Sequence, residues 1–180
     1  ALTWSQAMAM FRDQSGRPGP AAWKDGTYPP GQGDYPVGGL SWYEAAAYAW
    51  FRGKELPPLY HWLYAARSDD FPYRIARHSN FDNGPAPVGY YPGTGRFGLC
   101  DVAGNVREWC YNAVEGQADK RGILGGAWSD HEYIFVTGEM RSPWDRDIAN
   151  GLRCATYLGG RELVPDLAFC AAECKHRDFE

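Results

Sequence analysis

One stretch, Phe97–Trp109, constrains the fold of this chain more than any other. It places Gly104 and Asn105 between apolar residues, and both residue types enter the left-handed backbone region that tight turns require. The stretch therefore predicts a tight turn and excludes an uninterrupted helix or strand. Such a turn would bring Asp101 and Glu108 toward each other, with backbone carbonyls between them.

These two carboxylates have two readings. Together with the carbonyls they would form an oxygen-rich pocket that suits a hard cation such as calcium. Alternatively, Asp101 caps the turn and Glu108 pairs with a nearby arginine, and both contacts are commoner in proteins than bound ions. The residues alone leave both readings open.

Several segments of the chain resemble the formylglycine-generating enzyme superfamily, also called the sulfatase-modifying-factor domain. Gly98–Trp109 resembles the family signature GL-D-GNVWEW, and Pro36–Ala45 followed by Gly53–Pro57 resembles PV--VSW-DA with GKRLP. Three further matches follow in the family's order: His61–Arg67 with EWEYAAR, Gly125–Trp128 with GGSW, and Asn150–Cys154 with NGFRC. The resemblance implies an α+β fold of the C-type-lectin-like, loop-rich type.

The resemblance covers about residues 36–157. We therefore expect a single domain over residues 1–158, followed by a tail or linker over residues 159–180. The family's usual first strand has no counterpart that we can find in the sequence. An aromatic content of 16% with 22 Gly and 13 Pro predicts many loops held in place by large rings.

Local patterns predict the main elements. Ser41 and Glu44 form a capping box at the start of a helix that ends at Gly53. Further helices are expected over Leu2–Arg12, with an apolar stripe, and over Leu59–Arg67, with Trp62 and Tyr64 on its buried face. The remaining expectations are strands over Ile123–Trp128 and Leu152–Tyr157 and an ordered loop or lid over Gly16–Pro36.

The catalytic residues implied by the resemblance are absent. Catalytic members of the family oxidise a substrate cysteine with two copper-binding cysteines that follow the GGS segment. Alignment places Asp130 and Phe135 at these positions, and neither side chain supplies the thiolate that Cu(I) prefers. The sequence therefore predicts no copper and no formylglycine synthesis.

Iron is not expected either, and a structural zinc is disfavoured. A related branch of the family binds iron with histidines in an HxxxHxE pattern, and none of His61, His78, His131 and His176 has that spacing. Cys170 and Cys174 with His176 are only half of a zinc ligand set, so free thiols in a tail are the favoured reading. Asp130–His131 could form an exposed acid–base pair, but no neighbouring nucleophile is evident.

The resemblance strengthens the calcium hypothesis. Several family members bind calcium at this turn, and the equivalent ligands here are the side chains of Asp101 and Glu108 and the carbonyls of Gly104 and Val106. Arg107, which replaces the family's usual Trp, places a positive charge close to the site and weakens the hypothesis.

A candidate ligand-binding surface lies between Trp128 and Asn150. Trp, Tyr and Arg dominate binding hot spots, and loops on a rigid base are where binding residues concentrate. The alternative is that the aromatic residues belong to the core and the charges form a solvated rim. The candidate residues are Trp128, Ser129, Asp130, His131, Tyr133, Arg141, Trp144, Asp145 and Arg146.

Charge and cysteine usage limit the function classes. A formal net charge of −4 gives no indication of nucleic-acid binding, and the longest apolar run, Ala45–Phe51, is too short to span a membrane. The five cysteines do not form a disulfide framework. Secreted family members pair a cysteine at the Cys154 position with one at the position of Ala49, so we expect free thiols and a cytoplasmic location.

The sequence thus predicts a non-catalytic module that binds a ligand or docks a protein, a pseudoenzyme on this scaffold. Gly16–Tyr48 is similar to the domains fused to bacterial Ser/Thr kinases, which suggests a sensor in a larger bacterial signalling protein. Two alternatives remain: a thiol oxidoreductase with a rearranged site that uses Cys100, Cys110 or Cys154, and a variable binding protein of the diversity-generating-retroelement type. The sequence does not identify the protein or small-molecule ligand.

Overall fold

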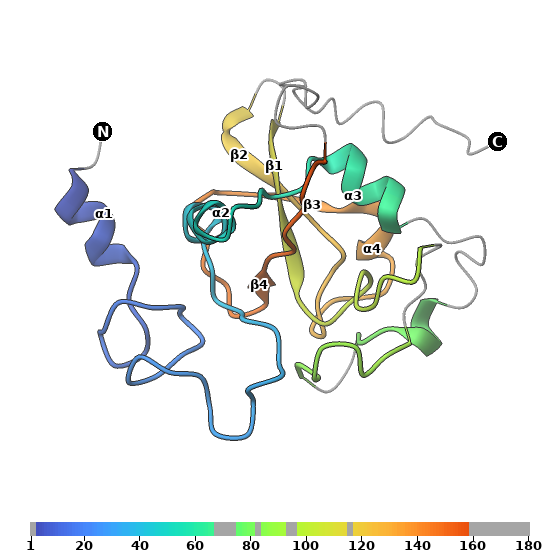
Figure 1. Cartoon of the computed structure of the whole chain (residues 1–180), viewed down its shortest axis with the longest axis horizontal. Helices are drawn as coiled ribbons and strands as arrows, with labels where there is room; N and C mark the ends of the chain where they lie inside the picture. The colour runs from blue at the N-terminus through green and yellow to red at the C-terminus, as the bar shows by residue number, and fades with distance from the viewer. Residues whose placement is uncertain (1–2, 67–74, 82–83, 93–96, 115–116, 159–180) are drawn as a thin grey trace.

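The computed structural model describes residues 3–66, 75–81, 84–92, 97–114 and 117–158. Its elements, in chain order, are α1 (Trp4–Met10), α2 (Trp42–Phe51), α3 (Leu59–Ala66), the 3₁₀ turn η1 (Ile75–His78), β1 (Arg107–Val114), β2 (Gln117–Leu124), α4 (Ile134–Thr137), β3 (Glu139–Arg141) and β4 (Asn150–Gly151). Short helices and strands alternate with long irregular segments (Figure 1). The predicted loop-rich α+β class is confirmed.

The strands form one sheet in the order β3-β2-β1-β4. β1 pairs antiparallel with β2, placing Glu108 opposite Leu124 and Trp109 opposite Ile123, and β4 pairs parallel with β1 through Arg107 and Asn150. β1 carries a register irregularity between Trp109 and Ala113, which increases the local twist of the strand.

The two faces of the sheet carry separate hydrophobic clusters, because successive strand residues point to opposite sides. Trp109 and Ile123 pack with Ala45 and Ala49 of α2. Their neighbours Cys110 and Leu124 pack with α3 and with Phe135 of α4. Trp109 is fully buried, and its indole Nε1 donates to the Leu40 carbonyl at 2.8 Å. Helices α2 and α3 thus fix the sheet from both sides.

The predicted start of α2 is confirmed. The Ser41 hydroxyl accepts from the backbone N–H of Glu44 at 3.2 Å, and the Glu44 carboxylate accepts from the Ser41 backbone N–H at 2.9 Å. The helix ends at Phe51, and Gly53 follows with φ +65°, as expected of a glycine that stops a helix.

Some helix predictions need correction. The N-terminal helix spans only Trp4–Met10, and none of its residues is buried, so it has no apolar face against the domain. Helix α3 begins at Leu59 as expected, but Tyr64 is 62% exposed while Trp62 and Ala66 are buried. The predicted C-terminal residue of α3, Arg67, lies outside the described residues.

The strand predictions were only partly right. β2 contains Ile123 and Leu124, but Gly125 and Gly126 have φ values of +92° and +71° and end the strand there. Leu152–Tyr157 is not a strand. It makes an isolated bridge in which Ala155 exchanges two backbone hydrogen bonds with Glu55, because no longer strand lies beside it.

Candidate functional site

Arg107, at the start of β1, is the centre of a buried ionic network. Its side chain is 7% exposed and forms an ion pair with Asp130. The guanidinium also lies 3.3 Å from a carboxylate oxygen of Glu139 and 3.2 Å from one of Asp147. It donates to the Asn150 side-chain oxygen at 3.3 Å. A buried charge is costly unless it is paired in this way, so the partners of Arg107 are needed to keep its guanidinium inside the fold.

Asp130 occupies the position that aligns with the first copper-binding cysteine. One carboxylate oxygen pairs with Arg107, and the other accepts from the backbone N–H of Ala127 at 2.9 Å. The Asp130 side chain therefore has two roles: it closes the turn after Gly125–Gly126, and it neutralises the charge of Arg107. The hypothetical pair with His131 does not form, because His131 is exposed and stacks on Tyr133 instead.

Phe135 occupies the position of the second cysteine and belongs to the core. It is 8% exposed, and its ring centroid lies 6.0 Å from that of Trp62. The two aligned positions thus hold an ion-paired carboxylate and a packed phenyl ring.

The thiols of the described residues are unbridged: Cys100, Cys110 and Cys154. Burial, with the Glu108 charge, raises the pKa of the Cys110 thiol well above its ordinary value. Burial also raises the pKa of Cys154, although Lys54 and Arg52 oppose this. A raised pKa keeps a thiol protonated and weakens it as nucleophile and metal ligand. Cys110 and Cys154 also pack with different hydrophobic clusters.

The predicted turn is present, since Asp101, Gly104 and Asn105 have φ values of +56°, +75° and +65°. A Cβ on Gly104 would lie 2.1 Å from the Asn80 carbonyl oxygen, so the chain requires glycine there. The buried Asn105 side chain accepts from the Ala86 N–H and donates to the Ala86 carbonyl. The turn therefore joins two loops of the domain.

Glu108 pairs with an arginine, as the second reading of the turn predicts. Its carboxylate accepts two hydrogen bonds from Arg153, at 2.9 and 2.8 Å, and one from the Trp62 indole at 2.6 Å. Burial lowers the pKa of Arg153, but the Glu108 charge outweighs this and raises it. Asp101 accepts from the Gly89 N–H at 2.6 Å.

This arrangement does not fit calcium at the predicted ligands. Both Glu108 oxygens already accept hydrogen bonds from Arg153, and the charge of this guanidinium would repel a metal ion at the same carboxylate. Asp101 faces a different loop from Glu108 through its bond to Gly89. Nothing in the described contacts gathers the Gly104 and Val106 carbonyls with these side chains, and calcium stays a prediction of the sequence.

Part of the predicted ligand-binding surface is exposed. Ser129 and His131 lie at the surface, and Tyr133 is 60% exposed. Trp128 is half-buried and lines a pocket, while its backbone N–H donates to the Asn105 carbonyl at 3.0 Å. These residues follow directly after the buried glycine turn, which gives them a fixed base.

Other predicted surface residues hold the fold together. Arg146 forms a two-bond ion pair with Glu44 and donates to the carbonyls of Met10, Arg12 and Gly19. It thus ties the N-terminal segment to α2. We call Arg146 and Glu44, with these three carbonyls, the Arg146 clamp.

Trp144 and the charged residues near it also make contacts within the fold. Trp144 lies between Phe11, stacked at 5.9 Å, and Tyr43 at 4.4 Å between ring centroids. Arg141 pairs with Glu139 at 2.9 Å and with Asp145 at 3.0 Å. The predicted ligand-binding surface therefore contains two groups of residues. Ser129, His131 and Tyr133 are exposed, whereas Arg141, Trp144, Asp145 and Arg146 make contacts within the fold.

His61 contacts a tyrosine, and the half-set of zinc ligands considered from the sequence lies outside the described residues. His61 is exposed and its Nδ1 lies 2.9 Å from the Tyr157 hydroxyl. Cys170, Cys174 and His176 lie outside the described residues. Among the residues that are described, no cluster of three or more His, Cys, Asp or Glu side chains is arranged to hold a metal ion.

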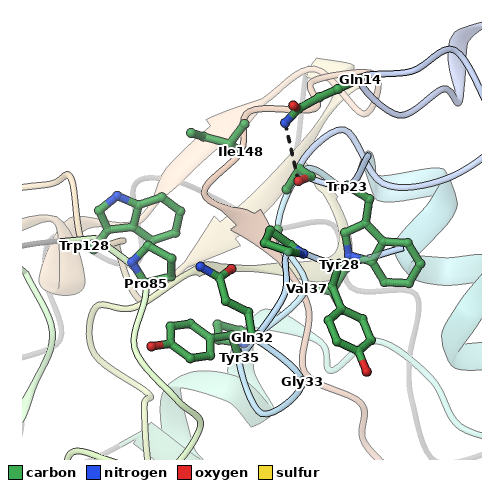
Figure 2. Close-up of a pocket in the computed structure, with 14 residues that line it drawn as sticks. Gln14, Trp23, Tyr28, Gln32, Gly33, Tyr35, Val37, Pro85, Trp128 and Ile148 are labelled. Carbon is green, nitrogen blue, oxygen red and sulfur yellow. Dashed lines mark hydrogen bonds between the residues drawn. The ribbon is translucent and has the colours of Figure 1, made fainter. Parts of the chain in front are cut away.

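The pocket beside Trp128 was missed as a site by sequence reasoning. Its wall comes from the Gly- and Pro-rich segment between Gln14 and Gly38, with Pro85 and Ile148 from other loops (Figure 2). The segment was expected to be an ordered loop or lid, and its Tyr and Trp content was the available signal. No periodic pattern in a loop tells which rings face each other, so the pocket itself could not be predicted.

In the part of the chain that the structure describes, no helix is both long and apolar enough to cross a lipid bilayer.

Together the fold and this site define a class: a loop-rich α+β domain with an ion-paired Asp130 and a core Phe135 at the two positions where the sequence resemblance implies copper-binding cysteines. The chain belongs to the sulfatase-modifying factor enzyme 1-like domain family, whose model matches residues 19–158. The family resemblance is thereby confirmed.

Individual relatives agree with this membership. The chain is 31% identical to "Inactive C-alpha-formylglycine-generating enzyme 2" of Bos taurus over 70% of this chain and 52% of that protein. It is 38% identical to "Serine/threonine-protein kinase Pkn1" of Chlamydia trachomatis over 70% of this chain and 25% of that protein. The chain spans about half the length, or less, of the curated relatives it matches.

A solved structure shares the fold. "Treponema denticola variable protein 1" superposes with a TM-score of 0.59 at 18% identity, over 71% of this chain and 74% of that one. At this identity the likeness concerns the fold alone.

Proposed function

We propose that this domain is a non-catalytic module that recognises a ligand or docks a protein through the surface around Trp128. One observation carries the proposal: Asp130, at the position of a copper-binding cysteine, is committed to the ion pair with Arg107 and to the Ala127 N–H. The exposed residues beside it, His131 and Tyr133, remain available for contacts with a partner.

The chemistry of the aligned positions supports this. Cu(I) favours soft thiolate ligands, whereas a carboxylate is a hard ligand, and this one already neutralises a buried guanidinium. Removing it from Arg107 would leave a buried cation partly uncompensated, which costs several kcal/mol in typical proteins, about 3–5. Phe135 has no ligand atom at all and contributes to the core.

The relatives support a role within a larger protein. One relative's name calls it inactive, and another is a protein kinase of which this chain matches only 25%. We propose that the domain serves as a sensor or recruiting module in a larger bacterial signalling protein. No separate observation favours the variable-protein alternative, since its structural likeness reflects the fold alone.

A copper-competition titration tests the non-catalytic part. Purified protein is titrated against a chromophoric Cu(I) chelator under reducing conditions, beside Cys110→Ser and Cys154→Ser variants. We expect all three proteins to leave the chelator spectrum unchanged. One equivalent of copper withdrawn by the native chain and lost in either variant would contradict the proposal.

A second assay measures chemistry directly. A synthetic peptide with a single cysteine is incubated with the protein, copper and oxygen, and aldehyde formation is followed by hydrazone trapping. We expect no aldehyde above the protein-free control. Turnover that depends on the protein would establish the rival oxidoreductase function.

A further inference from the structure

The pocket beside Trp128 has a volume of about 350 Å³. Its walls carry four aromatic rings, those of Trp23, Tyr28, Tyr35 and Trp128. Figure 2 shows Trp128 and Pro85 on one side with the Tyr35 ring below them, Trp23 and Tyr28 on the other side, and Gln32 between the two sides. The Trp23 and Tyr28 rings meet edge to face at 6.0 Å and form one corner of the pocket.

The pocket is free of formal charge. None of the described residues that line it is Asp, Glu, Lys, Arg or His, although 22% of the chain is charged. Its polar groups are two carboxamides, Gln14 and Gln32, and the ring N–H and hydroxyl groups. Gln14 donates only a long hydrogen bond, 3.5 Å, to the Ala22 carbonyl. Within the described structure, no hydrogen bond engages the side-chain polar atoms of Gln32, Tyr28 or Tyr35.

We infer that this pocket binds an uncharged sugar ring, an inference that rests on the proposed recognition function and names its ligand class. One face of a pyranose presents C–H groups with slight positive charge, which suit the negative faces of aromatic rings. Sugar hydroxyls both donate and accept hydrogen bonds, as do carboxamides and phenols.

Other ligand classes match less well. An ionic ligand would need an opposite charge, which the lining lacks. A proline-rich peptide lacks backbone N–H groups at its prolines and offers mainly carbonyl acceptors, so it would leave the carboxamide oxygens of Gln14 and Gln32 without donors. The volume lies at the small end of the usual range for ligand pockets, which suits one or two sugar rings.

The aromatic wall is held in position before any ligand arrives. The Arg146 clamp fixes the segment at Met10, Arg12 and Gly19. Asp13 accepts hydrogen bonds from the backbone of Ser15, Arg17 and Gly26.

The far end of the segment is fixed as well. A Cβ on Gly38 would lie 2.0 Å from the Ile148 carbonyl oxygen, so backbone meets backbone there. The Val88 N–H donates to the Asp34 carbonyl at 2.8 Å. A preformed site loses little conformational entropy on binding.

Titrations with neutral oligosaccharides test the inference. Chitotriose, maltotriose and mannotriose are added to the full chain up to millimolar concentration, with tryptophan fluorescence and saturation-transfer NMR as readouts. We expect at least one of them to bind saturably. Trp128→Ala should weaken that binding by about tenfold or more, because it removes a stacking face. Tyr35→Phe, which removes only a hydroxyl, should weaken it by about threefold.

Trp50→Ala is the matched control. Trp50 is 76% exposed and does not line the pocket, so its loss should leave binding unchanged. Should Trp128→Ala fail to fold, Tyr35→Phe and Gln32→Ala decide the matter. The inference is overturned if none of the three sugars binds. It is also overturned if a sugar binds but Trp128→Ala, Tyr35→Phe and Gln32→Ala all leave that binding unchanged.

Two further probes separate the two proposals. Decaproline that binds in a Trp128-dependent way in place of the sugars would overturn the sugar class but keep the recognition function. One equivalent of copper withdrawn from the chelator by the native chain, and lost in Cys110→Ser or Cys154→Ser, would overturn the non-catalytic function whatever the sugars do.

Discussion

Replacing Arg146 by Met should release the N-terminal segment that forms the pocket wall. Met keeps most of the aliphatic stem but removes every donor of the clamp. In the native chain these donors make five hydrogen bonds, at 2.6–2.9 Å, and the Arg146 and Glu44 side chains are each 14% exposed.

The expected loss of stability is moderate. Breaking a buried ion pair typically costs about 3–5 kcal/mol. Here Glu44 keeps its two hydrogen bonds from Ser41, and the Met10 and Arg12 carbonyls belong to exposed residues that water can reach. We therefore expect a loss of about 2–3 kcal/mol in the free energy of unfolding. For a chain of this size that corresponds to a fall of roughly 4–12 °C in Tm.

Two measurements check this prediction: thermal unfolding followed by circular dichroism, and limited trypsin digestion at Arg12 and Lys24. Cleavage at these sites should accelerate in Arg146→Met, because the segment opens locally. Arg52→Met is the matched control, since Arg52 is exposed and has no ion pair within the described structure. The reasoning is refuted if Arg146→Met unfolds and is cleaved like Arg52→Met.

Three further substitutions test local contacts that stabilise the fold: a helix cap, a glycine turn and a hydrogen-bonded carboxylate. Ser41→Ala should lower the free energy of unfolding by about 1–2 kcal/mol in urea titrations, whereas Thr3→Ala, at the cap of the unburied α1, should leave it nearly unchanged. Gly104→Ala should lower the free energy of unfolding by about 3 kcal/mol or more, because the new Cβ would meet the Asn80 backbone. Gly53→Ala, with open space around it, should lower it by about 1 kcal/mol. Equal losses in the two variants would contradict the steric argument. Desolvation raises the pKa of Asp13, but the hydrogen bonds from Gly26, Ser15 and Arg17 outweigh it and hold the pKa at about 2. The pKa of Asp13 is thus lower in the folded state than in the unfolded state. The difference in free energy of unfolding between the native protein and Asp13→Asn should therefore be full above about pH 4 and disappear as the pH falls toward 2. A difference that does not change with pH would refute this.

Local signals in the sequence predicted local structure well. The Ser41–Glu44 box and the glycine turn at Gly104–Asn105 depend on neighbouring residues, and both are present. The pairing of Glu108 with an arginine was one of two readings, and the structure identifies Arg153 as that partner.

Long-range contacts could not be read from the sequence. Arg146 meets Glu44 across 102 positions and Met10 across 136, and no periodicity links them. Residue type and a position between two predicted elements therefore predict a ligand-binding role for it, although its contacts are structural. Leu152–Tyr157 alternates like a strand, yet it has only Glu55 to pair with, because a strand requires a neighbour that its own sequence does not reveal.

The pocket illustrates the same limit. Trp23, Tyr28 and Tyr35 lie in a segment without helix or strand periodicity, and they meet Trp128 only through tertiary contacts. Composition predicts that the loop is ordered, but the contacts that hold its backbone, the clamp at Gly19 and the close approach at Gly38, join it to residues more than 100 positions away.

The central claim is that Asp130, at a position where the resemblance implies a copper-binding cysteine, forms an ion pair with Arg107 that stabilises the fold. A double-mutant cycle with Arg107→Met and Asp130→Asn tests it most directly, because Asn can still accept from the Ala127 N–H. We predict a coupling free energy of at least about 1.5 kcal/mol from urea unfolding. The same cycle on the more exposed pair of Arg141 and Asp145 should give less than about 1 kcal/mol. A coupling near zero between Arg107 and Asp130 would contradict the account.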